Sequence, residues 1–381
     1  MKHILVVTTS FPDVAFQAGQ EAAGIFVYDF VVELARWVRV TAVAPTANSQ
    51  SSTEQTGNLT IHRFPVPSLP LSLLTPSSPA QWRSIVRTMR SGQQAVQDVV
   101  KDGGVDHIFA LWVLPSGYWA KVVGEKYGVP YSTWALGSDI WSLGKVPLVK
   151  NMLQSVLRHS QYRFADGYQL AEDVKSLSKL DCDFLPSTRK LPVSSKKKLA
   201  SAPPYKLAYL GRWHPHKGTD LLLESLHLLL DDDWAKIEAV QICGGGPLED
   251  LVHERGKALQ ENGRPVTIRG YLNREEAADL LLWADYLLLP SRIESIPVIF
   301  SDALQANCPL IACPVGDIPR LMENYQVGIL ASAVTIHAMV TAIQQALHTS
   351  PARYQTGIVA LKEEFSVENS AQRLLGHLWE Q

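Results

Sequence analysis

Long hydrophobic runs are missing from this chain of 381 residues. No stretch approaches the roughly 18 consecutive apolar residues of a membrane-spanning helix. The opening segment, Met1 to Ser10, holds one lysine, a short apolar run and three hydroxyl residues. It is too short for a secretory signal peptide and predicts a first buried strand instead.

Cysteine is scarce, and two familiar motifs are missing as well. The four cysteines, Cys182, Cys243, Cys308 and Cys313, show no CxxC spacing, so neither a disulfide framework nor a zinc site is predicted. No GxGxxG follows the first predicted strand, which removes the nicotinamide-binding fingerprint. No Asp-x-Asp stands at the carboxyl end of a predicted strand, so no metal site is expected. We expect a reduced, cytoplasmic protein.

Charged residues make up only 19% of the chain, with a net charge of −2, but they are unevenly distributed. Residues 1–200 contain 21 Lys and Arg against 15 Asp and Glu, and the remainder contains 14 against 22. A basic first half suggests an anionic partner, such as phospholipid head groups or a lipid phosphate. Chance clustering, to which the run Lys196 to Lys198 contributes, is the alternative.

A hydrophobic content of 46% in a chain of this length predicts two domains, each with its own core. Short apolar runs alternate with helical patterns in both halves, which predicts βαβ units and doubly wound parallel sheets. Strands are expected at 3–7, 40–44, 60–64, 107–111, 131–134, 206–210, 239–243, 266–269, 286–289 and 310–312, and helices at 25–37, 80–99, 117–127, 148–158, 220–230, 248–261, 274–283, 298–306 and 335–347.

Proline, serine and lysine interrupt this alternation over residues 187–204, and such a composition is typical of a linker. The predicted domains are therefore residues 1–186 and residues 205–365. Ligands of doubly wound domains bind at the carboxyl ends of the strands, so we expect the two sheets to face each other across a cleft.

An acidic loop lies between the predicted strand 286–289 and the predicted helix 298–306. Glu294 is on the loop, Pro297 suits the first turn of the helix, and Asp302 lies one turn further along. Free N–H groups at a helix amino end can hold a phosphate, and flanking carboxylates can accept hydrogen bonds from sugar hydroxyls. The combination suits a sugar nucleotide.

A basic loop follows the predicted strand 206–210. Gly211 permits a sharp exit from the strand, and Arg212 and Lys217 then extend over the cleft. Two cations on one such loop suit a diphosphate, the arginine as a fork and the lysine as a point charge. An ordinary loop with two solvated cations is the alternative.

Glycines follow two further predicted strands. Gly244 to Gly246 allow backbone to approach a ligand closely, although a tight turn is a sufficient explanation. Gly270 and Tyr271 either line a base pocket or simply end a strand.

Taken in order, these motifs resemble glycosyltransferase family 4, also called glycosyl transferases group 1. The motifs are Gly-Arg-x4-Lys-Gly after a strand, Gly-x-Gly-Pro, Ile-Arg-Gly-Tyr, Ala-Asp-x4-Pro-Ser, and two acids separated by seven residues. The resemblance covers residues 206–320 densely and the first half loosely. It implies an α/β GT-B fold of two Rossmann-like domains, with the donor bound by the second and the acceptor by the first. A helix at about 366–381 is expected to return to the first domain.

The resemblance also implies roles for individual residues. Arg212 and Lys217 match the pair that grips the donor diphosphate and stabilises the departing nucleotide, and Glu294 matches the acid that contacts the transferred sugar. Asp302 matches the acid that holds the ribose hydroxyls. The family usually has glutamate there, so the shorter aspartate would reach the ribose from a shifted helix or through water.

Further matches concern donor contacts made by backbone. Ile296, Pro297 and Val298 match the helix start whose amides face the donor. Gly24 matches the glycine loop after the first strand, which approaches the donor phosphates. Other residues expected to bind the donor are Gly211, Gly244, Gly270 and Tyr271.

The first half departs from the family pattern at two positions. A histidine that is common after the strand 107–111 is replaced by Leu111, and the basic residue of an R-G-S-D segment is replaced by Leu136. Asp139 is the remaining polar candidate for catalysis in this half, and a helix cap is its alternative role. We interpret His107 as a strand-start histidine rather than a catalyst.

The implied function is retaining transfer of a sugar from a nucleotide-diphosphate sugar to a glycan or lipid-linked acceptor, in surface polysaccharide or glycoconjugate synthesis. In such enzymes the leaving diphosphate accepts the acceptor's proton, so no metal or other cofactor is expected. A UDP-sugar is the first expectation for the donor and a GDP-sugar the second. No nucleic-acid partner is expected. The basic first domain, including the amphipathic segment 150–163, suggests peripheral contact with the inner face of a membrane.

Two alternatives remain open. A GT-B sugar-nucleotide epimerase would use the same fold, and a non-catalytic GT-B module would bind a glycan or accompany a true transferase. The changes at Leu111, Leu136 and Asp302 favour the module. Intact Arg212, Lys217 and Glu294 oppose it. Donor-dependent release of free nucleotide is expected of an enzyme and not of a module.

Overall fold

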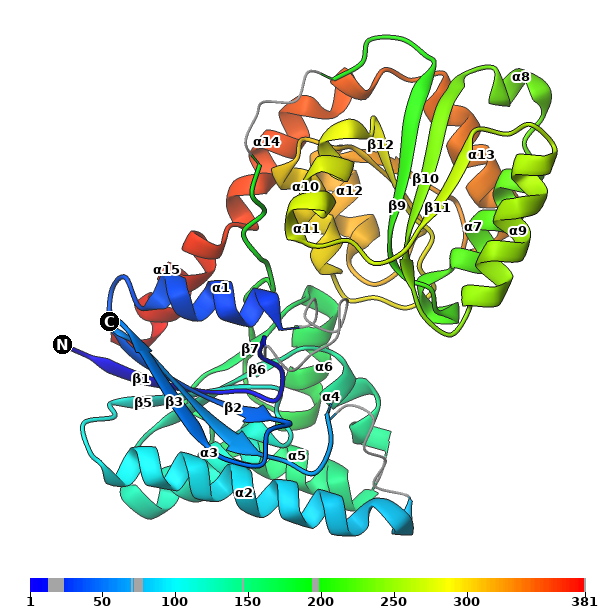
Figure 1. Cartoon of the computed structure of the whole chain (residues 1–381). Helices are drawn as coiled ribbons and strands as arrows, with labels where there is room; N and C mark the ends of the chain where they lie inside the picture. The colour runs from blue at the N-terminus through cyan, green and yellow to red at the C-terminus, as the bar shows by residue number, and fades with distance from the viewer. Residues whose placement is uncertain (13–23, 70, 72–77, 146, 194–198, 380–381) are drawn as a thin grey trace. The chain divides into compact units, whose positions relative to one another are not determined.

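The computed structural model describes residues 1–12, 24–69, 71, 78–145, 147–193 and 199–379. The chain folds into two compact units (Figure 1). The first comprises Met1–Ser187 together with Val367–Gln381, and the second comprises Thr188–Ser366. Residues 188–193, which their composition assigned to a linker, thus belong to the second unit. The lysine run Lys196 to Lys198 lies outside the described residues.

The first unit is built on an eight-stranded sheet in the order β3-β4-β2-β1-β5-β6-β7-β8. Neighbouring strands are parallel except β3 and β4, which are antiparallel. Its strands are β1 (His3–Val7), β2 (Arg39–Thr46), β3 (Ser52–Thr56), β4 (Leu59–Pro65), β5 (His107–Leu111), β6 (Tyr131–Ala135), β7 (Arg163–Ala165) and β8 (Asp183–Phe184).

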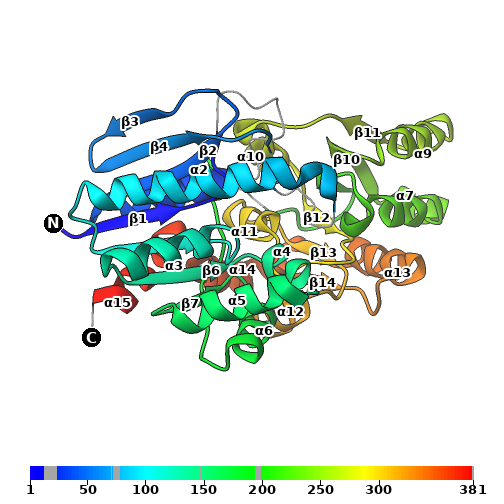
Figure 2. The same cartoon turned by 90° about the horizontal axis from the view of Figure 1, so that it is seen from below.

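Helices cover both faces of this sheet because its central strands are apolar on both sides. In β1, Ile4 and Val6 belong to one core cluster and Leu5 and Val7 to another. Helix α2 (Trp82–Lys101) packs in the second cluster and lies along one face (Figure 2), whereas α1 (Ile25–Leu34) and α15 (Val367–Trp379) pack in the first. The other helices are α3 (Ser116–Tyr127), α4 (Ser138–Trp141), α5 (Pro147–His159), α6 (Tyr168–Ser178), η3 (Pro79–Gln81) and η4 (Leu143–Lys145).

The second unit is built on a six-stranded sheet, parallel throughout, in the order β11-β10-β9-β12-β13-β14. The strands are β9 (Tyr205–Arg212), β10 (Ile237–Gly245), β11 (Val266–Arg269), β12 (Tyr286–Leu289), β13 (Leu310–Ala312) and β14 (Gly328–Leu330). The helices are η5 (Pro215–Lys217), α7 (Thr219–His227), α8 (Asp231–Trp234), α9 (Glu249–Glu261), α10 (Arg274–Trp283), α11 (Val298–Gln305), α12 (Ile318–Tyr325), α13 (Ile336–Leu347), η6 (Pro351–Tyr354) and α14 (Gln355–Glu364).

Each sheet contains a switch point, where the chain stops adding strands to one side of the sheet and begins to add them to the other side. In the second sheet, β10 and β11 extend one side of β9, and β12 to β14 extend the other. In the first sheet the corresponding neighbours are β1 and β5. The loops after two such neighbouring strands lie side by side at the carboxyl edge of the sheet, where doubly wound folds bind their ligands.

The predicted α/β fold with two doubly wound sheets is confirmed, and β1, β5, β11, β12 and β13 have their predicted bounds. The first sheet is not wholly parallel, because the polar edge strand β3 runs antiparallel. Strand β9 continues through Gly211 to Arg212, which corrects the predicted exit at Gly211. The sequence analysis missed the short strands β7, β8 and β14, which are two or three residues long, and also the longer elements β3, α6, α12 and α14. No helix in the described ranges is both long and apolar enough to cross a membrane.

Candidate functional site

The loops that follow β9 and β12 meet at the switch point of the second sheet. Gly218, which ends the first loop, has a left-handed backbone with φ of 69°. A side chain there would be strained, and its Cβ would overlap the carbonyl oxygen of Pro290 in the second loop. Glycine therefore lets the basic loop and the acidic loop close against each other.

Closure of the two loops brings Lys217 and Glu294 together. The Lys217 Nζ donates to Glu294 Oε1 at 2.5 Å, and the Ser291 hydroxyl donates to the same oxygen at 3.0 Å. The Glu294 side chain is only 10% exposed, whereas that of Lys217 is 36% exposed. Among the described residues none donates a hydrogen bond to Oε2 of Glu294, so this oxygen keeps its capacity to accept from a ligand.

Arg292 ties the same two loops together beside this pair. Its guanidinium donates to both carboxylate oxygens of Asp220, at 2.7 and 2.8 Å, and to the carbonyl oxygen of Pro215 at 2.7 Å. Its backbone N–H donates to the carbonyl oxygen of His216 at 2.8 Å. The hydrogen bonds to Asp220 raise the pKa of Arg292 above its ordinary value, so the pair is ionised at neutral pH. Sequence analysis missed both Arg292 and Asp220.

Arg212 is the last residue of β9 and is exposed. Within the described part of the chain no carboxylate forms an ion pair with it. The side chain of the next residue, Trp213, is buried. Arg212 is thus an exposed cation at the carboxyl end of β9, beside the switch point.

The glycines after β10 bring backbone close to β9 and to Tyr271. Gly244 has φ of 150°, and a Cβ there would overlap the carbonyl oxygen of Gly211. The Tyr271 hydroxyl donates to the carbonyl oxygen of Gly245 at 2.9 Å, and its side chain is still 47% exposed. Gly270 is exposed and accepts a hydrogen bond from the Gly244 N–H at 3.2 Å. These residues offer a surface of backbone and one aromatic ring next to Arg212's strand.

The start of helix α11 differs slightly from the sequence-based expectation. Pro297 is the N-cap with extended backbone (φ −72°, ψ 143°), and Val298 is the first helical residue. Ile296 and Pro297 are buried, whereas Val298 is partly exposed. The N–H groups of Val298 and Ile299 have no acceptor within the helix, so they remain donors at its amino end.

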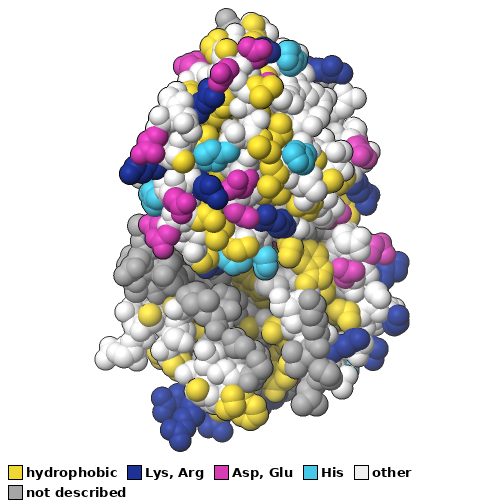
Figure 3. Space-filling model, turned by 90° about the vertical axis from the view of Figure 1, so that its right-hand side faces the viewer, with side chains coloured by type: hydrophobic (Ala, Val, Ile, Leu, Met, Phe, Trp, Pro, Cys, Tyr) yellow, Lys and Arg dark blue, Asp and Glu magenta, His cyan; other side chains and the backbone are white. Residues whose placement is uncertain are grey.

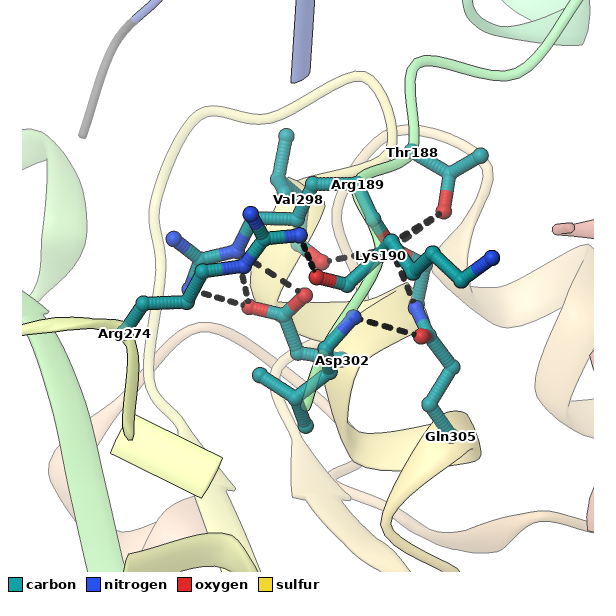
Figure 4. Close-up of polar contacts among 9 residues, drawn as sticks. Thr188, Arg189, Lys190, Arg274, Val298, Asp302 and Gln305 are labelled. Carbon is teal, nitrogen blue, oxygen red and sulfur yellow. Dashed lines mark hydrogen bonds and ion pairs between the residues drawn. The ribbon is translucent and has the colours of Figure 1, made fainter. Parts of the chain in front are cut away.

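Asp302 has a different environment from the one expected of a ribose-binding acid. Its carboxylate has no exposed surface, and Arg189, 11% exposed, is paired with it. Arg189 Nε and Nη2 donate to Oδ2 at 2.9 and 2.6 Å, and Nε also approaches Oδ1 at 3.1 Å. Figure 4 shows the guanidinium groups of both Arg189 and Arg274 pointing toward this carboxylate. Asp302 is thus engaged inside the second unit.

Asp139, the predicted catalytic residue of the first unit, is buried as well, with 2% exposure. Its Oδ2 accepts the Val113 N–H at 2.7 Å and its Oδ1 accepts the Leu136 N–H at 3.2 Å. Burial raises the pKa of Asp139 to about 6, against the opposing effect of these N–H donors. Asp139 therefore joins the loops that follow the neighbouring strands β5 and β6, and its side chain is buried between them. These contacts give Asp139 a structural role in the fold, and its catalytic role remains a prediction.

Two other residues of the first unit, Gly24 and His107, were also interpreted from the sequence. Gly24 is the N-cap of α1, and a Cβ there would lie 2.8 Å from the backbone of Phe11, so glycine permits this close approach. The preceding Ala22 and Ala23 lie outside the described residues. His107 is buried, bonds the Ser132 hydroxyl at 2.9 Å, and has its pKa lowered to about 4 by burial. It is a core histidine, as interpreted from sequence.

Charge on the second unit is mixed rather than gathered by sign. On the face drawn in Figure 3, acidic and basic side chains are interspersed over this unit. For example, Arg255 forms an ion pair with Glu224 at 3.1 Å, and Lys206 forms one with Glu238 at 3.4 Å. In the described portion of the chain, no three His, Cys, Asp or Glu side chains are grouped so that they could hold a metal ion.

Comparison with known proteins agrees with this architecture. Residues 204–349 match the family model described as "Glycosyl transferases group 1". A Bacillus subtilis protein named as a teichuronic acid biosynthesis glycosyltransferase is 28% identical over 258 residues, which are 64% of this chain and 61% of that protein. The matched region is thus less than two thirds of that relative.

Solved structures share the fold over the whole chain. The sucrose-phosphate synthase of Thermosynechococcus elongatus has a TM-score of 0.76 at 17% identity, covering 100% of this chain and 99% of the other. The Anabaena protein HepE, solved with UDP and glucose, has a TM-score of 0.68 at 13% identity and covers 100% of both chains. At such identities the likeness concerns the fold.

Proposed function

We propose that this protein transfers a sugar from a nucleotide-diphosphate donor to a glycan or lipid-linked acceptor, because residues 204–349 match the family model of the glycosyl transferases group 1. The observation that carries the proposal is the junction of the basic and acidic loops. There an exposed Arg212, Lys217 and an acceptor oxygen of Glu294 lie on the two loops of one switch point. The setting proposed is surface polysaccharide or glycoconjugate synthesis, and the name of the Bacillus relative assigns that protein to teichuronic acid biosynthesis.

In the proposed reaction the bond between the anomeric carbon and the diphosphate oxygen breaks, and the electron pair stays on the diphosphate. An acceptor hydroxyl oxygen bonds to the anomeric carbon on the same face, so configuration is retained. The acceptor's proton passes to the departing diphosphate. Arg212 and Lys217 stabilise the charge that develops there, which is the largest contribution a protein can make without a metal.

Glu294 has two roles in this proposal. Through Oε1 it orients the Lys217 ammonium, which uses one of its three N–H groups for that bond and keeps two for the diphosphate. Through Oε2 it accepts a hydroxyl of the transferred sugar. The amino-end N–H groups of α11 provide further donors to the phosphates.

The proposal also covers the identity of the donor, the unit that binds the acceptor and the location of the protein. We take a UDP-sugar as the first candidate donor, and the UDP bound to HepE is consistent with this choice. The acceptor is assigned to the first unit, in a cytoplasmic protein that contacts a membrane peripherally. Support for that contact lies on the amino half of α2, where Trp82 is 59% and Val86 is 45% exposed. Exposed arginines of the same half-helix are Arg83, Arg87 and Arg90.

The first test is a thermal-shift screen of UDP, GDP, ADP and their sugars. A ligand present at a hundred times its Kd stabilises the fold by about 2.7 kcal/mol. We expect one nucleotide to win and Arg212→Ala to abolish its shift. Glu294→Ala should lose only the additional shift caused by the sugar. Arg353→Ala, which removes an exposed arginine of η6 in the same unit, is the matched control and should leave every shift intact.

A non-catalytic module that binds a glycan is the competing function. The burial of Asp139 and Asp302 favours it, because both predicted acids are engaged within their own units. Release of free nucleotide from the winning donor, lost in Arg212→Ala, would support the transferase. A shift without release would favour the module, an exchange of one sugar nucleotide for its epimer would favour the epimerase, and no shift at all would remove the donor site.

A further inference from the structure

Three residues of the segment that enters the second unit, Thr188, Arg189 and Leu191, are hydrogen-bonded to helix α11. The Thr188 hydroxyl donates to the Ser301 hydroxyl at 3.1 Å, and Arg189 forms the ion pair with Asp302. Further along, the Leu191 N–H donates to the Gln305 side-chain oxygen at 2.9 Å. The Gln305 side-chain N–H donates to the Arg189 carbonyl oxygen at 2.7 Å. Figure 4 draws Thr188, Arg189, Asp302 and Gln305 with the hydrogen bonds and ion pairs of this contact as dashed lines.

Asp302 is the centre of this contact. Its carboxylate is fully buried, and both of its oxygens lie within hydrogen-bond distance of the Arg189 guanidinium. Arg274, at the start of α10, donates to the carbonyl oxygen of Lys190 and points toward the same carboxylate. Turning Asp302 outward would leave the largely buried guanidinium of Arg189 without its carboxylate, which is costly.

A carboxylate can bind ribose only if its oxygen reaches the hydroxyl. Asp302 has no exposed oxygen, and the groups that cover it are guanidinium groups, which donate hydrogen bonds and accept none. The acid that the sequence pattern would place on the ribose is therefore used to hold the helix whose amino end carries the Val298 N–H.

We propose that Asp302 is a positioning residue that aligns α11 through Arg189, and that the donor site does not recognise the ribose hydroxyls through the carboxylate of Asp302. The proposal rests on the proposed function for its ligand, a nucleoside diphosphate. It has two consequences. The protein binds ribose and deoxyribose forms of its nucleotide with similar affinity, and loss of Arg189 weakens both forms by the same factor.

The experiment measures binding of UDP, 2′-deoxy-UDP and 3′-deoxy-UDP by calorimetry, with the guanosine series beside it. The proteins are wild type, Arg189→Ala, Asp302→Asn and the double variant. For wild type we expect the three nucleotides to bind within fivefold of one another. Each variant should raise the Kd of every nucleotide by a common factor of about five. The Kd values of the double variant should not exceed those of the weaker-binding single variant. Arg189→Lys, which keeps the charge, should restore part of the affinity.

Urea unfolding of the same proteins separates the outcomes. Both single variants should unfold at lower urea than wild type and should not be additive in the double variant, whereas Arg255→Ala, in the exposed pair with Glu224, should not shift the midpoint. A preference above fivefold for the ribose form in wild type overturns the proposal, as does Arg189→Ala with unchanged stability or unchanged Kd. If no nucleotide binds, the proposed function fails. The unfolding series then still decides whether Arg189 and Asp302 hold α11.

Discussion

Replacing Asp139 by asparagine should make the protein relatively more stable as the pH rises. In the folded chain the pKa of Asp139 is raised from 3.8 to about 6, because burial disfavours the charged carboxylate. A folded state with the higher pKa binds more protons than the unfolded state between these values. Wild type therefore keeps the full contribution of Asp139 below about pH 4 and loses it as the pH rises through 6.

The size of the effect follows from the pKa difference. A shift of about two units corresponds to about 3 kcal/mol, of which about 2 kcal/mol is lost between pH 4.5 and 7.5. Asp139→Asn carries no titrating group, so it escapes this loss. It pays a separate, pH-independent cost, because its NH₂ group must face the N–H of either Val113 or Leu136.

Urea unfolding of wild type and Asp139→Asn at pH 4.5, 5.5, 6.5 and 7.5 measures the difference. Titration of other groups, including the buried His107, cancels when the two proteins are compared at each pH. We expect the difference to move in favour of Asp139→Asn by about 2 kcal/mol across the series. A constant difference would refute the raised pKa. A movement in favour of wild type would show that the two N–H donors outweigh burial and hold the carboxylate ionised.

Two further predictions concern the junction of the basic and acidic loops. Arg292→Ala should raise the donor Kd about fivefold, or about 1 kcal/mol, because the loops lose their tie through Asp220. Since this pair is about one third exposed, the free energy of unfolding should fall by only about 1 kcal/mol. Equal binding by Arg292→Ala and wild type would exclude the positioning role. Gly218→Ala should destabilise by more than the roughly 1–2 kcal/mol of a left-handed residue, because its Cβ also overlaps Pro290. Gly263→Ala, with φ of 70° and nothing within 4 Å of the added Cβ, is its control, and equal losses in a thermal melt would remove the overlap argument.

Several residues together hold the basic and acidic loops in one arrangement. Lys217 and Glu294 face each other because Gly218 lets the chain pass close to Pro290, and because Arg292 and its partners hold both loops. Pairwise removal of such groups is expected to be non-additive, since they share one arrangement.

Local patterns in the sequence determined most of the secondary structure. Apolar runs of four or five residues mark buried strands whatever lies around them, so β12 and β13 could be bounded without a structure. Asn273 followed three residues later by Glu276 predicts a capping box, and both of its hydrogen bonds are present at the start of α10. Short or polar elements such as β3 carry no such signal, and only pairing with a neighbouring strand makes them strands.

Tertiary structure decided which charged residues are free and which are occupied. Asp302 and Glu294 look alike in the sequence, as two acids on either side of a helix start. In the fold Glu294 keeps an acceptor oxygen, whereas Asp302 is closed off by Arg189, a partner 113 residues away. Asp139 is likewise buried by backbone from a different loop. A residue's local sequence sets its chemistry, but its pKa and its accessibility depend on groups that only the folded chain brings within a few ångströms.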